Sequence, residues 1–76
     1  MKNVFDRGLF AERLKFLRTE KNIGQNQLAE ELELSNASIS YWETGKQLPT
    51  AEAIFKLAIY FNVSADYLLG IKEDWQ

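Results

Sequence analysis

Glycine and proline divide this chain into short segments, and that division is what most constrains its fold. Gly24, Gly45, Pro49 and Gly70 fall at spaced intervals, and these two residue types are the strongest local interruptions of regular structure. Between them the apolar residues recur every three or four positions rather than every second position, which is the helical period. The sequence therefore predicts an all-α fold of five short helices.

The capping residues set the expected helix and domain boundaries. Ser35, Thr50 and Ser64 each stand where a hydroxyl can accept a hydrogen bond from the first turn of a helix. The expected helices cover residues 9–21, 25–32 and 36–44, a fourth that follows Thr50 and ends near Asn62, and a fifth between Ser64 and Gly70. We expect one domain over residues 9–70, with a loosely held N-terminal arm (residues 1–8) and a C-terminal tail (residues 71–76).

Composition excludes most classes of function. The 76 residues include no cysteine and no histidine, which removes thiol, imidazole and nearly all zinc chemistry. No pair of acids is clustered where a cleft is expected, so we predict no enzyme, no metal and no cofactor. The longest apolar runs are only a few residues, too short for a membrane span or a signal peptide, and we expect a cytoplasmic protein.

The segment from residue 36 to residue 44 has an unusual exposed face. At 100° per residue, Ile39 and Trp42 point in one direction, which is the expected buried side. The opposite side has no charge and holds Asn36, Ala37, Ser40 and Tyr41. Asparagine can bond adenine through two hydrogen bonds, serine can bond base edges, and an alanine methyl can meet a thymine methyl. Spacing alone leaves two interpretations open, a face that reads the DNA major groove and an ordinary polar surface.

Several spaced motifs favour the first interpretation. The segment IGQNQLAEELELSNASISYWETGKQLP and its flanks contain an arginine, Gln-x-x-Leu-Ala, Ser-x-x-Ser-Ile, Glu-x-Gly-Lys and a proline, at Arg18, Gln25, Leu28, Ala29, Ser35, Ser38, Ile39, Glu43, Gly45, Lys46 and Pro49. The ending from Asn62 to Gly70 reads Asn-Val-Ser-x-Asp-Tyr-Leu-Leu-Gly. In register over about sixty residues, these motifs resemble the helix-turn-helix domain of the Cro/CI-type repressors, the XRE family.

The resemblance implies a five-helix lambda-repressor-like DNA-binding domain whose second and third helices form the helix-turn-helix. Together with the helical face, it assigns DNA-binding roles to Gln25, Ser35, Asn36, Ala37, Ser38, Ser40, Tyr41, Lys46 and Gln47. It also implies a structural salt bridge between Arg18 and Glu43. The chain departs from the family pattern at three positions: Gly24 replaces a capping serine or threonine, Glu33 replaces a glycine in the turn, and Ala37 replaces a longer polar reader.

These observations predict a sequence-specific double-stranded DNA-binding protein, a transcriptional repressor of bacterial or phage type. A homodimer on a palindromic operator is expected, with Leu48, Ile71 and Trp75 as its contact residues. The net charge of −2 opposes DNA binding, but we expect a basic binding half formed by Arg13, Lys15, Arg18, Lys21 and Lys46. The alternative is a protein-binding adaptor of the antitoxin or anti-repressor type. Because 76 residues leave no room for a ligand domain, we expect any inducer to act by another route, such as a partner protein.

Overall fold

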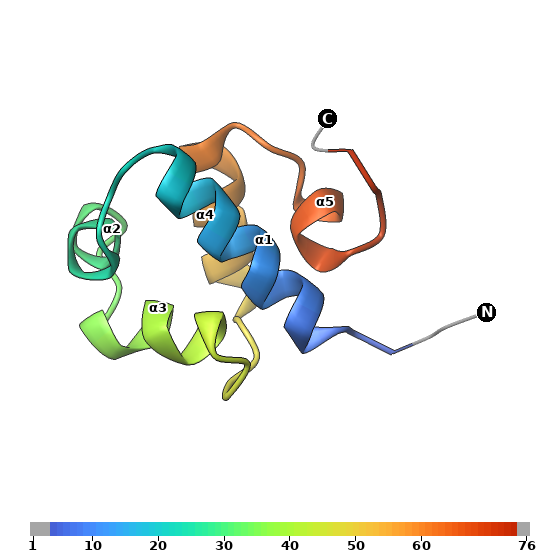
Figure 1. Cartoon of the computed structure of the whole chain (residues 1–76), viewed down its shortest axis with the longest axis horizontal. Coiled ribbons are helices and arrows are strands. Elements are labelled where there is room, and N and C mark those ends of the chain that lie inside the picture. The colour runs from blue at the N-terminus through green and yellow to red at the C-terminus, as the bar shows by residue number, and fades with distance from the viewer. Residues whose placement is uncertain (1–3, 75–76) are drawn as a thin grey trace.

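The computed structural model describes residues 4–74 and contains five helices with no strand over that range. They are α1 (Arg7–Glu20), α2 (Gln25–Glu31), α3 (Asn36–Glu43), α4 (Ala51–Phe61) and α5 (Ala65–Leu69) (Figure 1). This confirms the all-α prediction and the number of helices. None of these helices has the length and apolar character that crossing a membrane would require.

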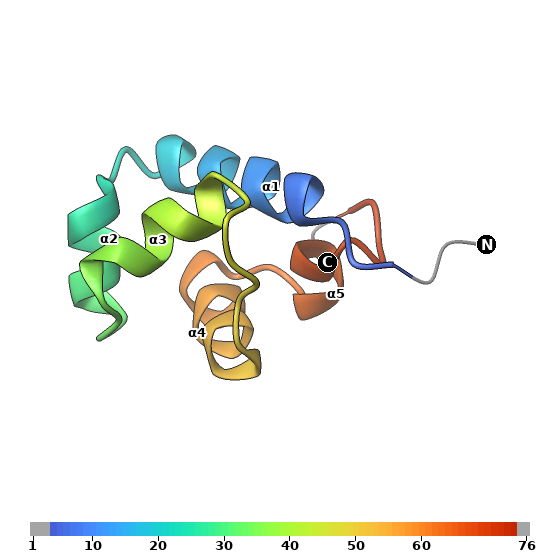
Figure 2. The same cartoon turned by 90° about the horizontal axis from the view of Figure 1, so that it is seen from below.

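The five helices pack around one core. In Figure 1, α1 lies in front, α4 lies behind it, and α3 lies along the lower edge with α2 beside it. Figure 2, seen from below, shows α3 nearest the viewer and α4 almost end-on. The axis of α4 is therefore roughly perpendicular to α3. This arrangement leaves the lower side of α3 open.

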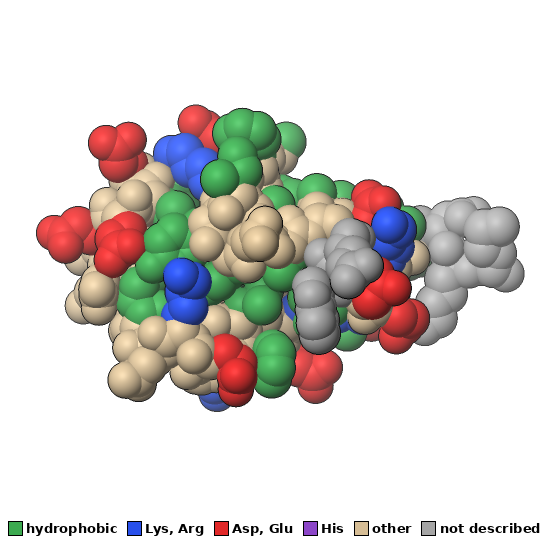
Figure 3. Space-filling model, turned by 90° about the horizontal axis from the view of Figure 1, so that it is seen from above, with side chains coloured by type: hydrophobic (Ala, Val, Ile, Leu, Met, Phe, Trp, Pro, Cys, Tyr) green, Lys and Arg blue, Asp and Glu red, His purple; other side chains and the backbone are tan. Residues whose placement is uncertain are grey.

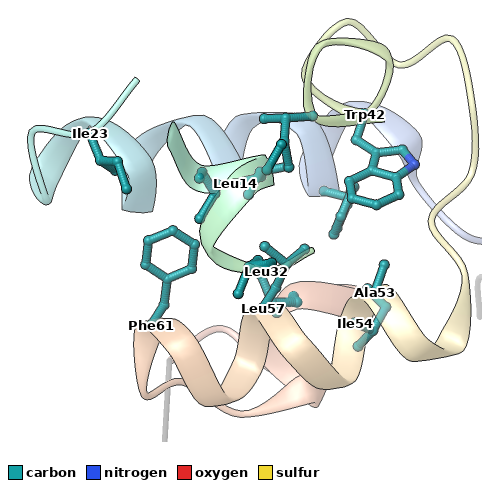
Figure 4. Close-up of a cluster of buried hydrophobic side chains, with 13 residues drawn as sticks. Leu14, Ile23, Leu32, Trp42, Ala53, Ile54, Leu57 and Phe61 are labelled. Carbon is teal, nitrogen blue, oxygen red and sulfur yellow. The ribbon is translucent and has the colours of Figure 1, made fainter. Parts of the chain in front are cut away.

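The core lies where α1, α3 and α4 meet. Its largest fully buried side chains come from all five helices and are Phe10, Leu14, Leu28, Ile39, Leu57 and Leu68. Figure 4 shows Leu57 and Phe61 directed from α4 towards Leu14 on α1. The expected inward stripes are confirmed, except that Leu17 and Ala58 are only partly buried.

The first helix begins two residues earlier than the sequence predicts. The Asp6 carboxylate accepts a hydrogen bond from the Leu9 amide at 3.0 Å, so Asp6 is the N-cap and Arg7 is the first helical residue. Phe5, before the cap, packs on Phe10 with ring centroids 6.0 Å apart, as in a hydrophobic staple. The predicted loose arm over residues 1–8 is thus wrong for its second half, because this cap and staple tie the chain to α1.

All five helices end in the same backbone motif. At each of these helix ends, either the C-cap residue or the residue that follows it has a positive φ. These residues are Asn22, Glu33, Gly45, Asn62 and Gly70, with φ values of 56°, 57°, 74°, 55° and 84°. The following amide returns to a carbonyl of the last turn, as from Lys46 N to Tyr41 O at 2.8 Å, which is the Schellman pattern. The predicted roles of Gly45, Asn62 and Gly70 as helix terminators are confirmed.

Two of the three predicted hydroxyl caps are present. The hydroxyls of Thr50 and Ser64 each accept a hydrogen bond at 3.0 Å from the amide three residues on. Ser35 is the N-cap of α3 as predicted, but its hydroxyl makes no hydrogen bond to the first turn and lies 2.7 Å from the hydroxyl of Ser38 instead. The Ser38 amide donates to the Ser35 carbonyl at 3.1 Å, which leaves the two hydroxyls to pair with each other.

Candidate DNA-binding surface

The turn between α2 and α3 fixes the angle of the helix pair. The Leu34 amide donates to the Ala29 carbonyl at 2.8 Å, and the Glu33 amide donates to the Glu30 carbonyl at 3.1 Å. These bonds require Glu33 to adopt its left-handed φ of 57°. Because Ala29 has no exposed surface and a very small side chain, the two helices can approach closely.

A buried ion pair locks the far end of α3 to α1. Arg18 Nε donates to Glu43 Oε2 at 2.6 Å, and Arg18 Nη2 donates to Glu43 Oε1 at 3.0 Å. The side chains are 13% and 3% exposed, respectively. Arg18 Nη1 also donates to the Ile23 carbonyl at 2.8 Å. The expected pair is therefore present, with the two-bond geometry typical of strong arginine–carboxylate contacts.

The same carboxylate also binds the start of α2. Gln25 Nε2 donates to Glu43 Oε1 at 2.9 Å, so Glu43 links the first residue of α2 to the last residue of α3. The hydrogen bond with Glu43 raises the pKa of Arg18 above its ordinary value, although desolvation of the guanidinium opposes that change. Both ends of the α2–α3 unit are thus fixed, one by the turn at Glu33 and the other by this three-residue network.

The outer side of α3 matches the face predicted from the helical wheel. Ile39 is fully buried and Trp42 is 5% exposed, so the core side is confirmed. Asn36 and Ala37 are exposed, Tyr41 is 40% exposed, and no ionisable group apart from the Tyr41 phenol lies on this side between residues 36 and 41. The surface also includes Ser35, exposed, and the half-buried Ser38 and Ser40.

The loop after α3 adds exposed polar groups beside this face. Lys46 and Gln47 are both exposed. Arg7, at the start of α1, places Nη1 3.5 Å from the Lys46 carbonyl, so two cationic residues meet at one end of α3. Sequence reasoning missed Arg7 because the helix was predicted to begin at residue 9. The signal was an aspartate three residues before Leu9, in the position of an N-cap.

The expected basic half contains fewer free cationic side chains than the sequence suggests. Arg13 is 8% exposed and faces α5, where its guanidinium donates to the Tyr67 and Lys72 carbonyls and lies 4.2 Å from the centroid of the Tyr67 ring. Arg18 is occupied by Glu43. Arg13 therefore adds no free cation to the expected basic half. Arg18 makes the salt bridge that the family resemblance implies, so it adds none either.

Lys15 and Lys46 keep the exposed positions that the sequence predicts. Among residues 4–74 neither ammonium group has an ion-pair partner. The Lys21 ammonium lies 4.9 Å from the centroid of the Tyr60 ring, away from α3. The cationic residues that the structure places beside the end of α3 are thus Lys46 and Arg7.

This geometry defines a helix-turn-helix unit held on a five-helix scaffold. The sequence profile of the helix-turn-helix family HTH_3 matches residues 14–68. The chain belongs to this family.

Curated relatives and a solved structure agree with that assignment. The chain is 45% identical over 64 residues to the HTH-type transcriptional activator BcrR of Enterococcus faecalis, covering 84% of this chain and 31% of BcrR. It is 37% identical over 62 residues to the HTH-type transcriptional regulator ImmR of Bacillus subtilis, covering 82% of this chain and 49% of ImmR. This chain therefore spans half or less of the length of these two relatives. Both are named as transcription regulators and neither as an enzyme, in line with the sequence-based prediction.

The solved structure is the P22 c2 repressor protein in complex with a synthetic operator. It superposes with a TM-score of 0.76 at 34% identity and covers 80% of this chain and 92% of that chain. This likeness confirms the lambda-repressor-like fold predicted from the sequence.

Proposed function

We propose that this chain is a transcription-regulator domain that binds double-stranded DNA in a sequence-specific manner. The observation that supports it best is the exposed face of α3, free of ion pairs and held rigidly by the network of Arg18, Glu43 and Gln25. A reading helix must be fixed in place before it meets DNA, because a mobile one would lose entropy on binding. The relatives' names and the operator complex of P22 c2 repressor support the same role.

In this proposal α3 enters the major groove and its exposed residues read base edges. Asn36 would bond an adenine, and the Ala37 methyl would contact a thymine methyl. Tyr41, 40% exposed on the same side, would contact bases or sugars. Ser35, Ser38 and Ser40 lie close to this face and would approach the DNA backbone or a thymine methyl.

Phosphate contacts would surround the reading face. The Gln25 amide uses one N–H on Glu43, and its second N–H is available for a phosphate oxygen. Lys46, Gln47 and Arg7 would contact phosphates at the other end of α3. These contacts position the helix but are independent of sequence, so the base contacts alone would set specificity.

With so few cations, one copy would bind DNA weakly. We therefore propose a homodimer on a palindromic operator, acting as a repressor by occupying it, in the cytoplasm. Two copies on half-sites one DNA turn apart, roughly 34 Å, would combine their affinities. The sequence-based dimer contacts remain a prediction: Leu48 and Ile71 are 53% and 71% exposed, and Trp75 lies outside the described residues.

Selection of bound duplexes from a random-sequence DNA pool tests the function. We expect one enriched half-site, and Asn36→Ala should relax the preference at a single adenine at a cost of about 1–3 kcal/mol. The matched change Gln47→Ala should weaken binding to all sequences by a similar factor. Absence of enrichment at low salt would refute DNA recognition and leave a protein-binding adaptor as the remaining interpretation.

A further inference from the structure

The outer face of α4 exposes two large apolar side chains. Phe55 and Ile59 are 64% and 65% exposed, one helical turn apart on the same face. Ile54, Leu57 and Phe61 point the opposite way, into the core (Figure 4). A solvent-facing helix side normally holds charged or polar residues, so this face is not explained by the folding of a single copy.

A shallow groove lies beside these side chains. Phe55 and Ile59 form one wall with Lys56 and Tyr60, and the end of α2 at Glu31–Glu33 forms the other, around a volume of about 320 Å³. In Figure 3 hydrophobic side chains project from the upper edge, the side on which α4 lies, next to basic and acidic groups. We call Phe55, Ile59 and this groove the α4 face.

We propose that the α4 face is the surface through which two copies of this chain associate. The proposal rests on the proposed function for its orientation on DNA. Symmetry supports a second copy as the occupant. Because α4 is roughly perpendicular to α3 (Figures 1 and 2), a two-fold axis parallel to α4 would leave the exposed sides of both α3 helices facing the same way. A single straight duplex requires that arrangement.

The charges around the face also suit a symmetric contact. Glu52 and Lys56 form an i, i+4 pair at 3.9 Å and lie on one side of the line through Phe55 and Ile59. Under a two-fold axis, the Glu52 and Lys56 side of one α4 lies against the other side of the second α4. That other side presents Ala51 and Asn62, which are small or uncharged. Neither charge would meet its own copy, so the contact avoids the like-charge repulsion that opposes most self-association.

The small size of the face predicts how strongly the copies associate. One buried aromatic side chain contributes about 150–250 Å², so two large side chains and their neighbours give well under the roughly 800 Å² per copy of a stable interface. The dimer should therefore be weak in free solution. Binding to adjacent half-sites would raise the effective concentration of one copy near the other and complete the association.

Sedimentation equilibrium and cross-linking test the face without DNA. Ile59→Glu should weaken self-association at least tenfold, because it places two like charges near the axis. The matched control Phe16→Glu, at a 51% exposed apolar residue of α1, should change it less than twofold. The sequence has no cysteine, so Phe55→Cys and Ile59→Cys can each be oxidised singly, with Phe16→Cys as the control. Far-ultraviolet circular dichroism verifies that each variant is folded.

The outcomes separate this inference from the proposed function. Faster disulfide dimerisation at residue 55 or 59 than at residue 16 supports the α4 face, and equal or slower rates overturn it. On duplexes recovered by selection, Ile59→Glu should bind a single half-site within about twofold of the unchanged chain and lose at least tenfold on the palindrome. Retained affinity on the palindrome overturns the inference. Loss of DNA binding by the unchanged chain overturns the proposed function while the cross-linking result still stands.

Discussion

The turn at Glu33 offers a sharp test of how the α2–α3 angle is maintained. Glu33 has a φ of 57°, a region in which an L-residue with a Cβ is disfavoured by about 1–2 kcal/mol. Glycine removes that cost but gains roughly 0.5–1 kcal/mol of backbone freedom in the unfolded chain. Glu33→Gly should therefore raise the free energy of unfolding by about 0.5–1 kcal/mol.

Thermal and urea unfolding measure the change. For a domain of this size 1 kcal/mol corresponds to roughly 4–8 °C in Tm, so we expect an increase of about 2–8 °C. The urea midpoint should rise with an unchanged slope, since the folded surface is the same. The gain arises from local backbone strain and requires no new contact.

Three control variants separate strain from charge. Glu33→Ala removes the carboxylate but keeps a Cβ at the same φ, so its effect should stay within about 0.5 kcal/mol. Asn22→Gly and Asn62→Gly alter the two other positive-φ residues that are not glycine, and because asparagine tolerates this conformation, little gain is expected. Equal stabilisation by Glu33→Ala and Glu33→Gly would refute the strain argument and assign the effect to charge.

Three further predictions address the network, the phosphate contacts and an exposed hydrogen bond. Arg18→Met leaves the nearly buried Glu43 carboxylate without its cation and should cost about 3 kcal/mol in urea unfolding, while adding Glu43→Met should recover part of that loss; full additivity would contradict the pairing. Binding to a selected duplex should weaken with salt at a log–log slope of about −0.9 per neutralised phosphate, and Lys46→Ala should make the slope less steep by about that amount; an unchanged slope excludes a phosphate contact. The Tyr60 hydroxyl donates to Glu31 at 2.8 Å, and this bond raises the pKa of Tyr60. The bond therefore stabilises the fold below that pKa and is lost as pH rises through it, and Glu31→Ala should lower the NMR titration midpoint of Tyr60.

Helix positions and the inward stripes were readable from the sequence because both depend on local spacing. Apolar residues at three- and four-residue intervals identify the buried side of α3 and α4, and the glycines and Asn62 identify helix ends. Asp6 shows the limit of this reasoning. Asp6 is a capping signal that the sequence contains. The contact between Phe5 and Phe10, which only the structure shows, is what distinguishes the residues preceding Leu9 from a loose arm.

The pairing of Arg18 with Glu43 was predictable only through the family resemblance. The two residues are separated by 25 positions, and nothing in the intervening spacing brings them together. Gln25 also donates to this carboxylate, and its contact with a DNA phosphate remains a prediction.

Charge was the property that sequence alone described least well. Arg13, Lys15, Arg18 and Lys21 fall on one helix, yet the structure directs Arg13 to α5 and Arg18 to α3, because their positions on α1 face neighbouring helices. Exposure of Phe55 and Ile59 likewise depends on which side of α4 meets the core.

The helix boundaries, to within about two residues, and the uncharged face of α3 followed from local spacing in the sequence. The helix-turn-helix class followed from the resemblance of its motifs to a known family. Tertiary structure alone decided which cations are free, which apolar residues remain exposed and how α4 is oriented relative to α3. Those properties depend on packing between helices far apart in the chain, and local spacing contains no record of that packing.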